Sequence, residues 1–171
     1  MANAVYDAAR TILAGRQFQD RPVSAEVIHR IVEAGRLSAS AMNGQPWHFV
    51  VVQDRARLQS LGKLVRTGPY IAHSAFAIVV GNAKNDMYGV SDCSRAIQSM
   101  LLTAWADGVA SNWTGFGGLD GVRREVGLPE PYDVLAVLPF GYPARPVKGI
   151  KKRKPLDEIA SSERFGTPFS D

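Results

Sequence analysis

The sequence has one cysteine in 171 residues, Cys93, so a single chain cannot form an internal disulfide. Small domains in oxidising compartments commonly depend on disulfides, and their absence fits the reducing cytoplasm. The sequence also lacks any run near the roughly 18 apolar residues of a membrane helix. Asp7 and Arg10 interrupt the apolar pattern at the N-terminus, which excludes a signal-peptide core. We therefore expect a cytoplasmic protein that binds no membrane.

Sequence signatures of several chemistries are missing as well. The three histidines lie far apart in the sequence and Cys93 has no thiol neighbour, so no metal site is predicted. The glycines of Trp113–Gly118 miss the spacing of a dinucleotide fingerprint because Asp120 stands where the third glycine is needed, and no Walker loop occurs. His48, at a strand start, and Cys93, near a helix start, are both interpreted as structural residues.

Positive charge is concentrated near the C-terminus. The net charge is +4, and five basic residues lie within Lys148–Lys154. This cluster fits three roles: a solvated tail, a patch for a polyanion, or a contact for one small phosphate. No RNA-binding aromatic signature or zinc-finger spacing accompanies it. Binding of nucleic acid is therefore not expected.

The composition, 46% hydrophobic and 21% charged, is that of one globular domain. Apolar residues at helical spacing predict helices over 3–14, 24–37, 54–64, 91–107 and 119–126. Apolar runs rich in β-branched and aromatic residues predict strands at Phe49–Val52, Ala75–Val80 and Val134–Phe140. We expect the first strand to be central, the second to end at Gly81, and Gly108 to cap the long helix. This interleaving predicts a layered α/β or α+β domain.

Four groups of residues suggest a binding site for a flat ligand. They are an amide-bearing block before the first strand (Ser40, Asn43, Gln45), the early Arg16, the glycine-rich turn Trp113–Gly118, and the basic cluster. Amides match the alternating donors and acceptors of a flavin pyrimidine edge, and glycines let backbone approach a ring. Arginine and lysine suit a terminal phosphate. These chemical arguments alone do not separate flavin from another flat phosphorylated ligand.

The chain resembles the FMN-dependent nitroreductase family over nearly its whole length. The block Ser40-Ala-Met-Asn43-Gly-Gln45-Pro-Trp47 is very close to the family's Ser-x-x-Asn-x-Gln-Pro-Trp. Looser matches occur in family order around it: RQFQDRPV from Arg16, AIQSMLLTAWADG after Asp92, GLPEPYDVLAVLPFGYP, and KKRKPL near the C-terminus.

The resemblance implies a role for each matching residue. Arg16 matches an arginine or lysine that contacts FMN. The block Ser40, Asn43 and Gln45 lines the flavin, and Thr114 and Gly115 pass backbone near its ring. Lys151 and Arg153 match basic residues that grip the phosphate.

The resemblance also implies a fold, an assembly and a reaction. The fold is an α+β three-layer sandwich with a central mixed β-sheet flanked by helices. A single domain, residues 1–171, forms an intertwined homodimer with FMN at the subunit interface, and the segment from about 145 to 171 reaches the partner. NAD(P)H reduces the flavin, and a nitroaromatic, quinone or similar acceptor reoxidises it. Hydride passes through flavin N5, so no side chain is named as catalytic.

One segment departs from the family pattern. Many relatives carry Arg-Arg-Ser or Arg-His-Ser where this chain has Ile12–Ala14, which cannot bind phosphate. Either Arg10 substitutes for the missing arginines or the C-terminal cluster carries more of the phosphate. The departure keeps two alternatives open: a flavin- or ligand-binding protein without turnover, and a reductase whose donor is a deazaflavin.

Overall fold

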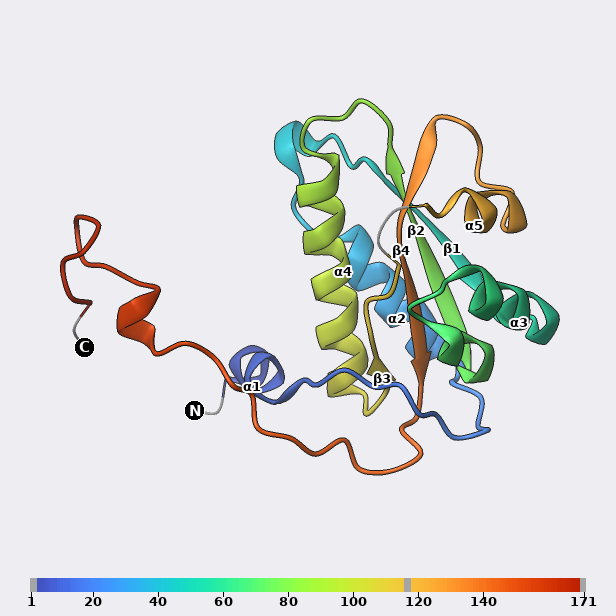
Figure 1. Cartoon of the computed structure of the whole chain (residues 1–171), viewed down its shortest axis with the longest axis horizontal. Helices are drawn as coiled ribbons and strands as arrows, with labels where there is room; N and C mark the ends of the chain where they lie inside the picture. The colour runs from blue at the N-terminus through green and yellow to red at the C-terminus, as the bar shows by residue number, and fades with distance from the viewer. Residues whose placement is uncertain (1–2, 116–117, 170–171) are drawn as a thin grey trace.

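The computed structural model describes residues 3–115 and 118–169, and Figure 1 shows its elements around one sheet. In chain order they are α1 (Ala4–Thr11), α2 (Ala25–Arg36), η1 (Ala41–Asn43), β1 (Trp47–Val52), α3 (Arg55–Leu64), η2 (Pro69–His73), β2 (Phe76–Ala83), α4 (Gly89–Ala106), β3 (Ala110–Ser111), α5 (Asp120–Glu125), β4 (Tyr132–Gly141) and η3 (Leu156–Glu158), where η denotes a 3₁₀ helix. No helix in this part of the chain is long and apolar enough to cross a membrane.

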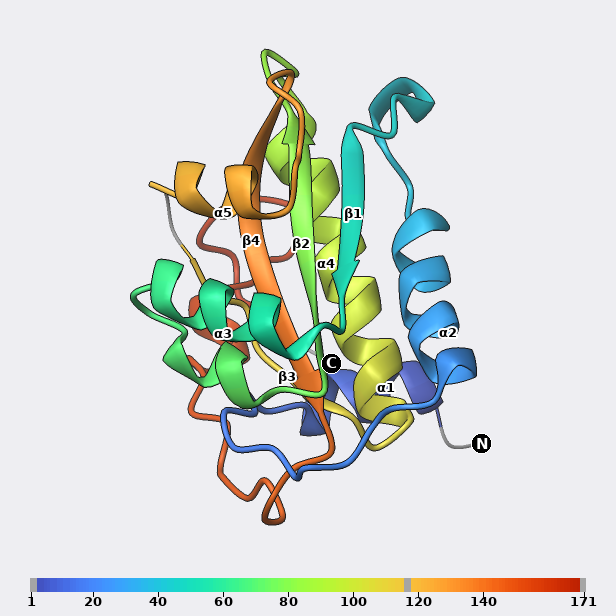
Figure 2. The same cartoon turned by 90° about the vertical axis from the view of Figure 1, so that its right-hand side faces the viewer.

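The sheet has the strand order β1-β2-β4-β3, and its three pairings are antiparallel. Helices α2 and α4 cover one face, and α3 and α5 cover the other (Figures 1 and 2). The arrangement confirms the predicted α+β three-layer sandwich. Its expected mixed character is confined to one isolated parallel bridge, which joins Ala14 to Ser111 beside β3.

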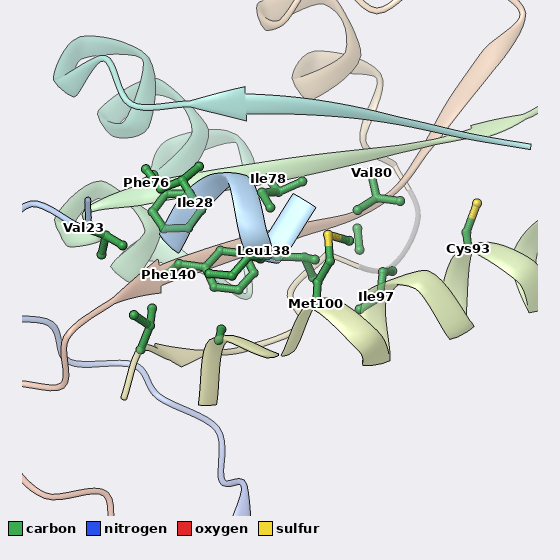
Figure 3. Close-up of a cluster of buried hydrophobic side chains, with 14 residues drawn as sticks. Val23, Ile28, Phe76, Ile78, Val80, Cys93, Ile97, Met100, Leu138 and Phe140 are labelled. Carbon is green, nitrogen blue, oxygen red and sulfur yellow. The ribbon is translucent and has the colours of Figure 1, made fainter. Parts of the chain in front are cut away.

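Two apolar clusters hold the three layers together. The cluster under α2 and α4, shown in Figure 3, includes the stacked rings of Phe76 and Phe140, whose centroids are 4.8 Å apart. Met100 and Ile97 of α4 pack against these strands with no exposed surface. The second cluster, under α3 and α5, includes the fully buried Leu61. The central strands β2 and β4 are therefore covered on both faces.

Two strand predictions were wrong, and one short strand was missed. β1 lies at the edge of the described sheet and is largely half-exposed, because an apolar run does not show how many neighbours a strand has. β2 continues through Gly81, where the register against β4 shifts. A Cβ at Gly81 would lie 3.0 Å from a methyl carbon of Leu128, so the glycine permits a close approach and does not end the strand. The two-residue β3 was not predicted.

Several predicted helix boundaries agree with the observed caps, but the first helix ends at Thr11 and not near residue 14, and α4 begins at Gly89, before the predicted residue 91. Ser24 Oγ accepts a hydrogen bond from the Val27 N–H at 3.4 Å, and Asp54 Oδ1 accepts one from the Arg57 N–H at 2.9 Å. Gly108 follows α4 with a φ of +73°, the left-handed conformation that ends a helix. Gly108 thus sets the C-terminal end of α4, the helix that lies beside the candidate site residues.

After β4 the chain leaves the sheet, passes beneath α1 and runs away from the layered body (Figure 1). This C-terminal segment carries large apolar side chains that one chain leaves exposed: Ile150, Leu156, Ile159, Phe165 and Phe169. Exposed apolar side chains grouped on one segment are typical of a surface that another chain covers.

Candidate functional site

The amide-bearing block lies between α2 and β1, beside the N-terminal end of α4 (Figure 1). Met42, Asn43 and Gln45 have φ values of +49°, +56° and +49°, a conformation that costs energy for residues other than glycine. Asn43 and Gln45 are exposed, and Ser40 is half-buried. The loop therefore presents its amide side chains outward from a strained backbone.

Hydrogen bonds to the backbone hold this strained loop in place. The Ala41 N–H donates to Asp92 Oδ2 at 2.9 Å, and the Gln45 N–H donates to Ser40 Oγ at 3.1 Å. The side-chain amide of Gln45 donates to the Asn43 carbonyl at 3.2 Å. Asp92, buried in the first turn of α4, was missed as a site residue because its sequence position shows only a helix start.

A cavity of about 730 Å³ lies between α1, the C-terminal half of α4 and the residues around the end of β3. Ile12, Leu13 and Leu101 give it apolar walls. Cationic side chains line it as well: Arg10 from α1, and Lys151 and Arg153 from the C-terminal segment. The structure thus brings both predicted basic residues, and Arg10, to one cavity.

Lys151 and Arg153 differ in how they are engaged. Lys151 Nζ donates a hydrogen bond to the carbonyl oxygen of Ala9, at the C-terminal end of α1. Partial burial, and to a lesser extent the charge of Arg153, lower the pKa of Lys151. The exposed guanidinium of Arg153 donates to the carbonyl of the adjacent Lys152 at 2.9 Å. Lys151 is therefore tied to α1, while Arg153 remains available to a ligand.

Arg16 lies outside that cavity. It lines a neighbouring hollow of about 360 Å³ together with Arg145 and Lys148. The two spaces share Ala14. The N–H of Gly15 donates to the Ser111 carbonyl at 2.9 Å, which fixes this segment against β3. The position of Arg16 is thus next to the cavity, where its charge adds to a positive potential.

Thr114 and Gly115 lie beyond β3, alongside β4. Thr114 exchanges two backbone hydrogen bonds with Val137, at 3.1 and 2.9 Å. Gly115 has a φ of +85°, and its N–H donates to Thr67 Oγ1 at 3.3 Å. Gly115 and Thr67 line a hollow of about 320 Å³ with Arg66. Arg66 and Thr67 were missed, because in the sequence they show only a place in a loop that precedes Gly-Pro.

Two residues of the predicted glycine-rich turn, Phe116 and Gly117, lie outside the described residues. The part that is described contains two buried polar atoms without a hydrogen-bond partner, Trp113 Nε1 and Thr114 Oγ1. Trp113 lines the large cavity. Because an unpaired buried donor is costly, these atoms point to a ligand or water that would pair with them.

The predicted site residues do not form one group. The amide loop lies beside the N-terminal end of α4, Lys151 and Arg153 line the cavity against the C-terminal half of α4, and Thr114 and Gly115 lie along β4. Asp92 anchors the amide loop in the first turn, and Trp105 in the last turn donates through Nε1 to Thr11 of α1 at 2.9 Å. Thirteen residues separate these two anchors. At 1.5 Å per residue, Asp92 and Trp105 are ~20 Å apart along the helix. The described residues that line the cavity of Arg153 do not include Gln45, so a single chain does not bring these two side chains to that cavity.

Other chemistries find no support at the site. Residues 3–115 and 118–169 contain no group of three or more His, Cys, Asp or Glu that could hold a metal ion. Burial, with smaller contributions from Asp92 and Asp86, raises the pKa of the Cys93 thiol to about 12, which makes it a poor nucleophile. His48 is exposed on the edge strand β1.

The residues present fit a flat anionic cofactor. An apolar cavity lined by guanidinium and ammonium groups suits a ring system that carries a phosphate. Trp113, whose buried Nε1 has no hydrogen-bond partner, also lines this cavity. The predicted set is thus chemically suitable, although one chain does not bring it together in one group.

Comparison with known proteins gives a consistent result. The model of the Nitroreductase family matches residues 8–71 and 66–142. A protein of Methanothermobacter thermautotrophicus, provisionally named NADH dehydrogenase/NAD(P)H nitroreductase, is 35% identical over 148 residues, which cover 82% of this chain and 78% of that protein. An FMN reductase [NAD(P)H] of Bacillus subtilis is 24% identical over 167 residues, covering 88% of this chain and 65% of its own length.

Solved structures extend the likeness to the fold. A crystal structure from Bacteroides thetaiotaomicron, with the same provisional name, superimposes with a TM-score of 0.87 and 30% identity, covering 96% of this chain and 100% of the other. An FMN-dependent nitroreductase from Clostridium difficile superimposes with a TM-score of 0.85 at 22% identity, covering 92% and 98% of the two chains. The second likeness concerns the fold alone.

Proposed function

The chain belongs to the nitroreductase family, and we propose that it binds FMN and uses it to pass reducing equivalents to an electron-poor acceptor such as a nitroaromatic or a quinone. Membership makes it an NAD(P)H-dependent oxidoreductase, as the names of its relatives support. The observation that carries the FMN assignment is the cavity of about 730 Å³, with apolar walls and cations from α1 and the C-terminal segment.

FMN, when bound, supplies the two-electron chemistry through its N5 atom. The tasks left to the protein are binding, orientation and electrostatics. Lys151 and Arg153 provide positive charge for a phosphate, and Arg16 adds positive charge that favours the reduced, anionic flavin. The hydrogen bonds between Thr114 and Val137 hold Gly115 in position, and its lack of a side chain lets a ring approach the backbone.

We further propose that two copies of the chain complete each site. The loop of Ser40, Asn43 and Gln45 of one subunit would reach the cavity of its partner, since α4 separates this loop from the cavity within a chain. The apolar side chains left exposed after residue 145 support a C-terminal segment, about 145–171, that lies on the partner. On this proposal the whole chain, 1–171, is one nitroreductase-like domain of an intertwined homodimer.

The segment Ile12–Ala14 favours a second candidate. Without hydrogen-bonding side chains there, the site could hold a flavin or another ligand without turnover, or accept electrons from a deazaflavin in place of NAD(P)H. The donor experiment separates these possibilities.

Purified protein should carry or take up FMN, seen as a visible flavin spectrum, and NADH or NADPH should bleach it without oxygen. Adding a nitroaromatic or a quinone should restore the spectrum. Protein that takes up no FMN would refute the proposal. FMN that only a reduced deazaflavin bleaches would refute NAD(P)H as donor, and FMN that no donor bleaches would favour the non-redox candidate.

Subunit complementation tests the shared site. Gln45→Ala and Arg153→Ala should each impair flavin-dependent turnover in a homodimer. If each site takes Gln45 from one chain and Arg153 from the other, a mixed dimer of the two variants contains one doubly altered site and one intact site. Unfolding and refolding the two variants together should therefore restore activity, up to about half of the mixed-dimer sites. No recovery would refute the shared site, and a mixture of Gln45→Ala with itself is the control.

A further inference from the structure

The segment Ile12–Ala14 has no side chain that could bind an FMN phosphate, so other side chains of this chain must hold it. The side chains of Ile12, Leu13 and Ala14 are apolar, and all three line the large cavity. Three cationic side chains line it too, Arg10, Lys151 and Arg153, and their surroundings differ.

The ammonium of Lys151 is committed to the protein. The last helical N–H of α1, that of Ile12, bonds to the Ala8 carbonyl at 2.9 Å, so the Ala9 carbonyl is one of those left open at the helix end. Lys151 donates to that carbonyl. A cation at a helix C-terminus is favoured by the helix dipole, and this contact fixes the C-terminal segment against α1. Lys151 thus has a structural role on α1.

Arg153 follows two residues after Lys151, in a segment without regular secondary structure. It lines the same cavity as Lys151, and its exposed guanidinium donates a hydrogen bond to the backbone carbonyl of Lys152. The Lys151 contact therefore determines where Arg153 can reach relative to α1.

Arg10 approaches the same cavity from α1. Its partner is Asp7, whose Oδ1 lies 3.4 Å from Arg10 Nη2, and both side chains are largely exposed. Such an exposed pair contributes little and exchanges readily for a stronger anion. Two guanidinium groups that line one cavity can each form paired hydrogen bonds to phosphate oxygens, which an ammonium cannot do.

We propose that Arg10 and Arg153 form the phosphate subsite, and that Lys151 is a positioning residue that holds Arg153 beside α1. Arg10, about one helical turn upstream, thus provides the phosphate contact that the segment 12–14 does not provide. This inference rests on the proposed FMN function and deepens it.

The test compares FMN with riboflavin, which is the same flavin without the phosphate. Flavin-depleted full-length protein is titrated with each flavin, and binding is followed by quenching of flavin fluorescence. Wild-type protein should prefer FMN. Arg10→Ala and Arg153→Ala should each weaken FMN binding by about 10- to 100-fold, the range for a charged hydrogen bond, and leave riboflavin binding unchanged. Arg57→Ala, an exposed arginine on α3, is the matched control and should change neither.

The role of Lys151 needs a double-mutant cycle. Lys151→Met should weaken FMN binding on its own, Lys151→Arg should restore it, and Lys151→Met should add nothing in an Arg153→Ala background. Effects that add in the double variant would make Lys151 a direct phosphate ligand and refute its positioning role.

The binding results distinguish a failure of the phosphate subsite from a failure of the proposed FMN function. A wild-type protein that binds neither flavin would overturn the proposed function and this subsite with it. FMN binding that survives in Arg10→Ala would overturn the subsite alone. If Arg10→Ala loses both flavins, Arg10→Gln, which keeps most of the side-chain stem, replaces it, and an unchanged preference of that variant for FMN would again refute the subsite.

Discussion

Replacing Asp92 with alanine should release the loop that carries Ser40, Asn43 and Gln45. Asp92 is 1% exposed, and its Oδ2 accepts the Ala41 N–H at 2.9 Å. Removing a hydrogen bond to a charged group costs about 1.5–3 kcal/mol. A carboxylate in the first turn of α4 contributes about 0.3–1 kcal/mol through the helix dipole. The neighbouring Arg95, at 3.2 Å but 55% exposed, adds little.

The free energy of unfolding should therefore fall by about 2–4 kcal/mol in Asp92→Ala, a melting-temperature decrease of roughly 4–16 °C. Asp92→Asn should lose less, because its amide oxygen can still accept the Ala41 N–H. Asp120→Ala, on an exposed first turn of α5, is the control and should change stability little.

Native-state amide exchange supplies the local measurement. The Ala41 amide should lose protection in Asp92→Ala and keep most of it in Asp92→Asn, while amides in β2 and β4 stay protected. Equal protection of the Ala41 amide in the wild type and in Asp92→Ala would show that the carboxylate does not anchor the loop.

Three further changes test the packing behind the site. Leu61→Ala removes a fully buried side chain and should cost about 2–5 kcal/mol in urea unfolding. Gly68→Ala would place a Cβ 2.5 Å from Thr114 Oγ1, so it should destabilise the chain by about 1–3 kcal/mol; an unchanged melting temperature would contradict that contact. With its pKa raised to about 12, native Cys93 should be about 10⁻⁴ ionised at pH 8, so a thiol reagent should modify it only after unfolding.

The sequence contained most of the information for the fold, because helix caps and apolar spacing are local. Ser24 and Asp54 stand at the starts of their helices and Gly108 follows the end of α4, as expected. The errors concern neighbours in space. The apolar run of β1 could not reveal its edge position, and Gly81 looked like a strand end although it accommodates the side chain of Leu128.

The candidate site could be predicted only in part from the sequence, because it too depends on which residues are neighbours in space. Residue types showed which groups suit a flavin, and the family resemblance named their positions. They did not show that the Ala9 carbonyl engages Lys151, or that Arg10 lines the same cavity as Arg153. Those facts depend on the path of the C-terminal segment past α1, which no local pattern determines.

The length of α4 makes one last prediction, which joins the loop to the shared site. Asp92→Ala should loosen the loop of its own chain, but it leaves α4 between the amide loop and the cavity of Arg153. Its defect should therefore belong to the same half of the site as that of Gln45→Ala. Mixed dimers of Asp92→Ala with Arg153→Ala should recover activity, because one of their two sites has an intact loop and an intact Arg153.

Mixed dimers of Asp92→Ala with Gln45→Ala should not recover, because every site then receives a defective loop. Recovery in both mixtures would place Asp92 outside either half. Recovery with Gln45→Ala but not with Arg153→Ala would place it with the basic group and not with the loop that its carboxylate contacts. That second result would contradict both the anchor and the two-chain site, since each depends on α4 separating the amide loop from the cations within one subunit.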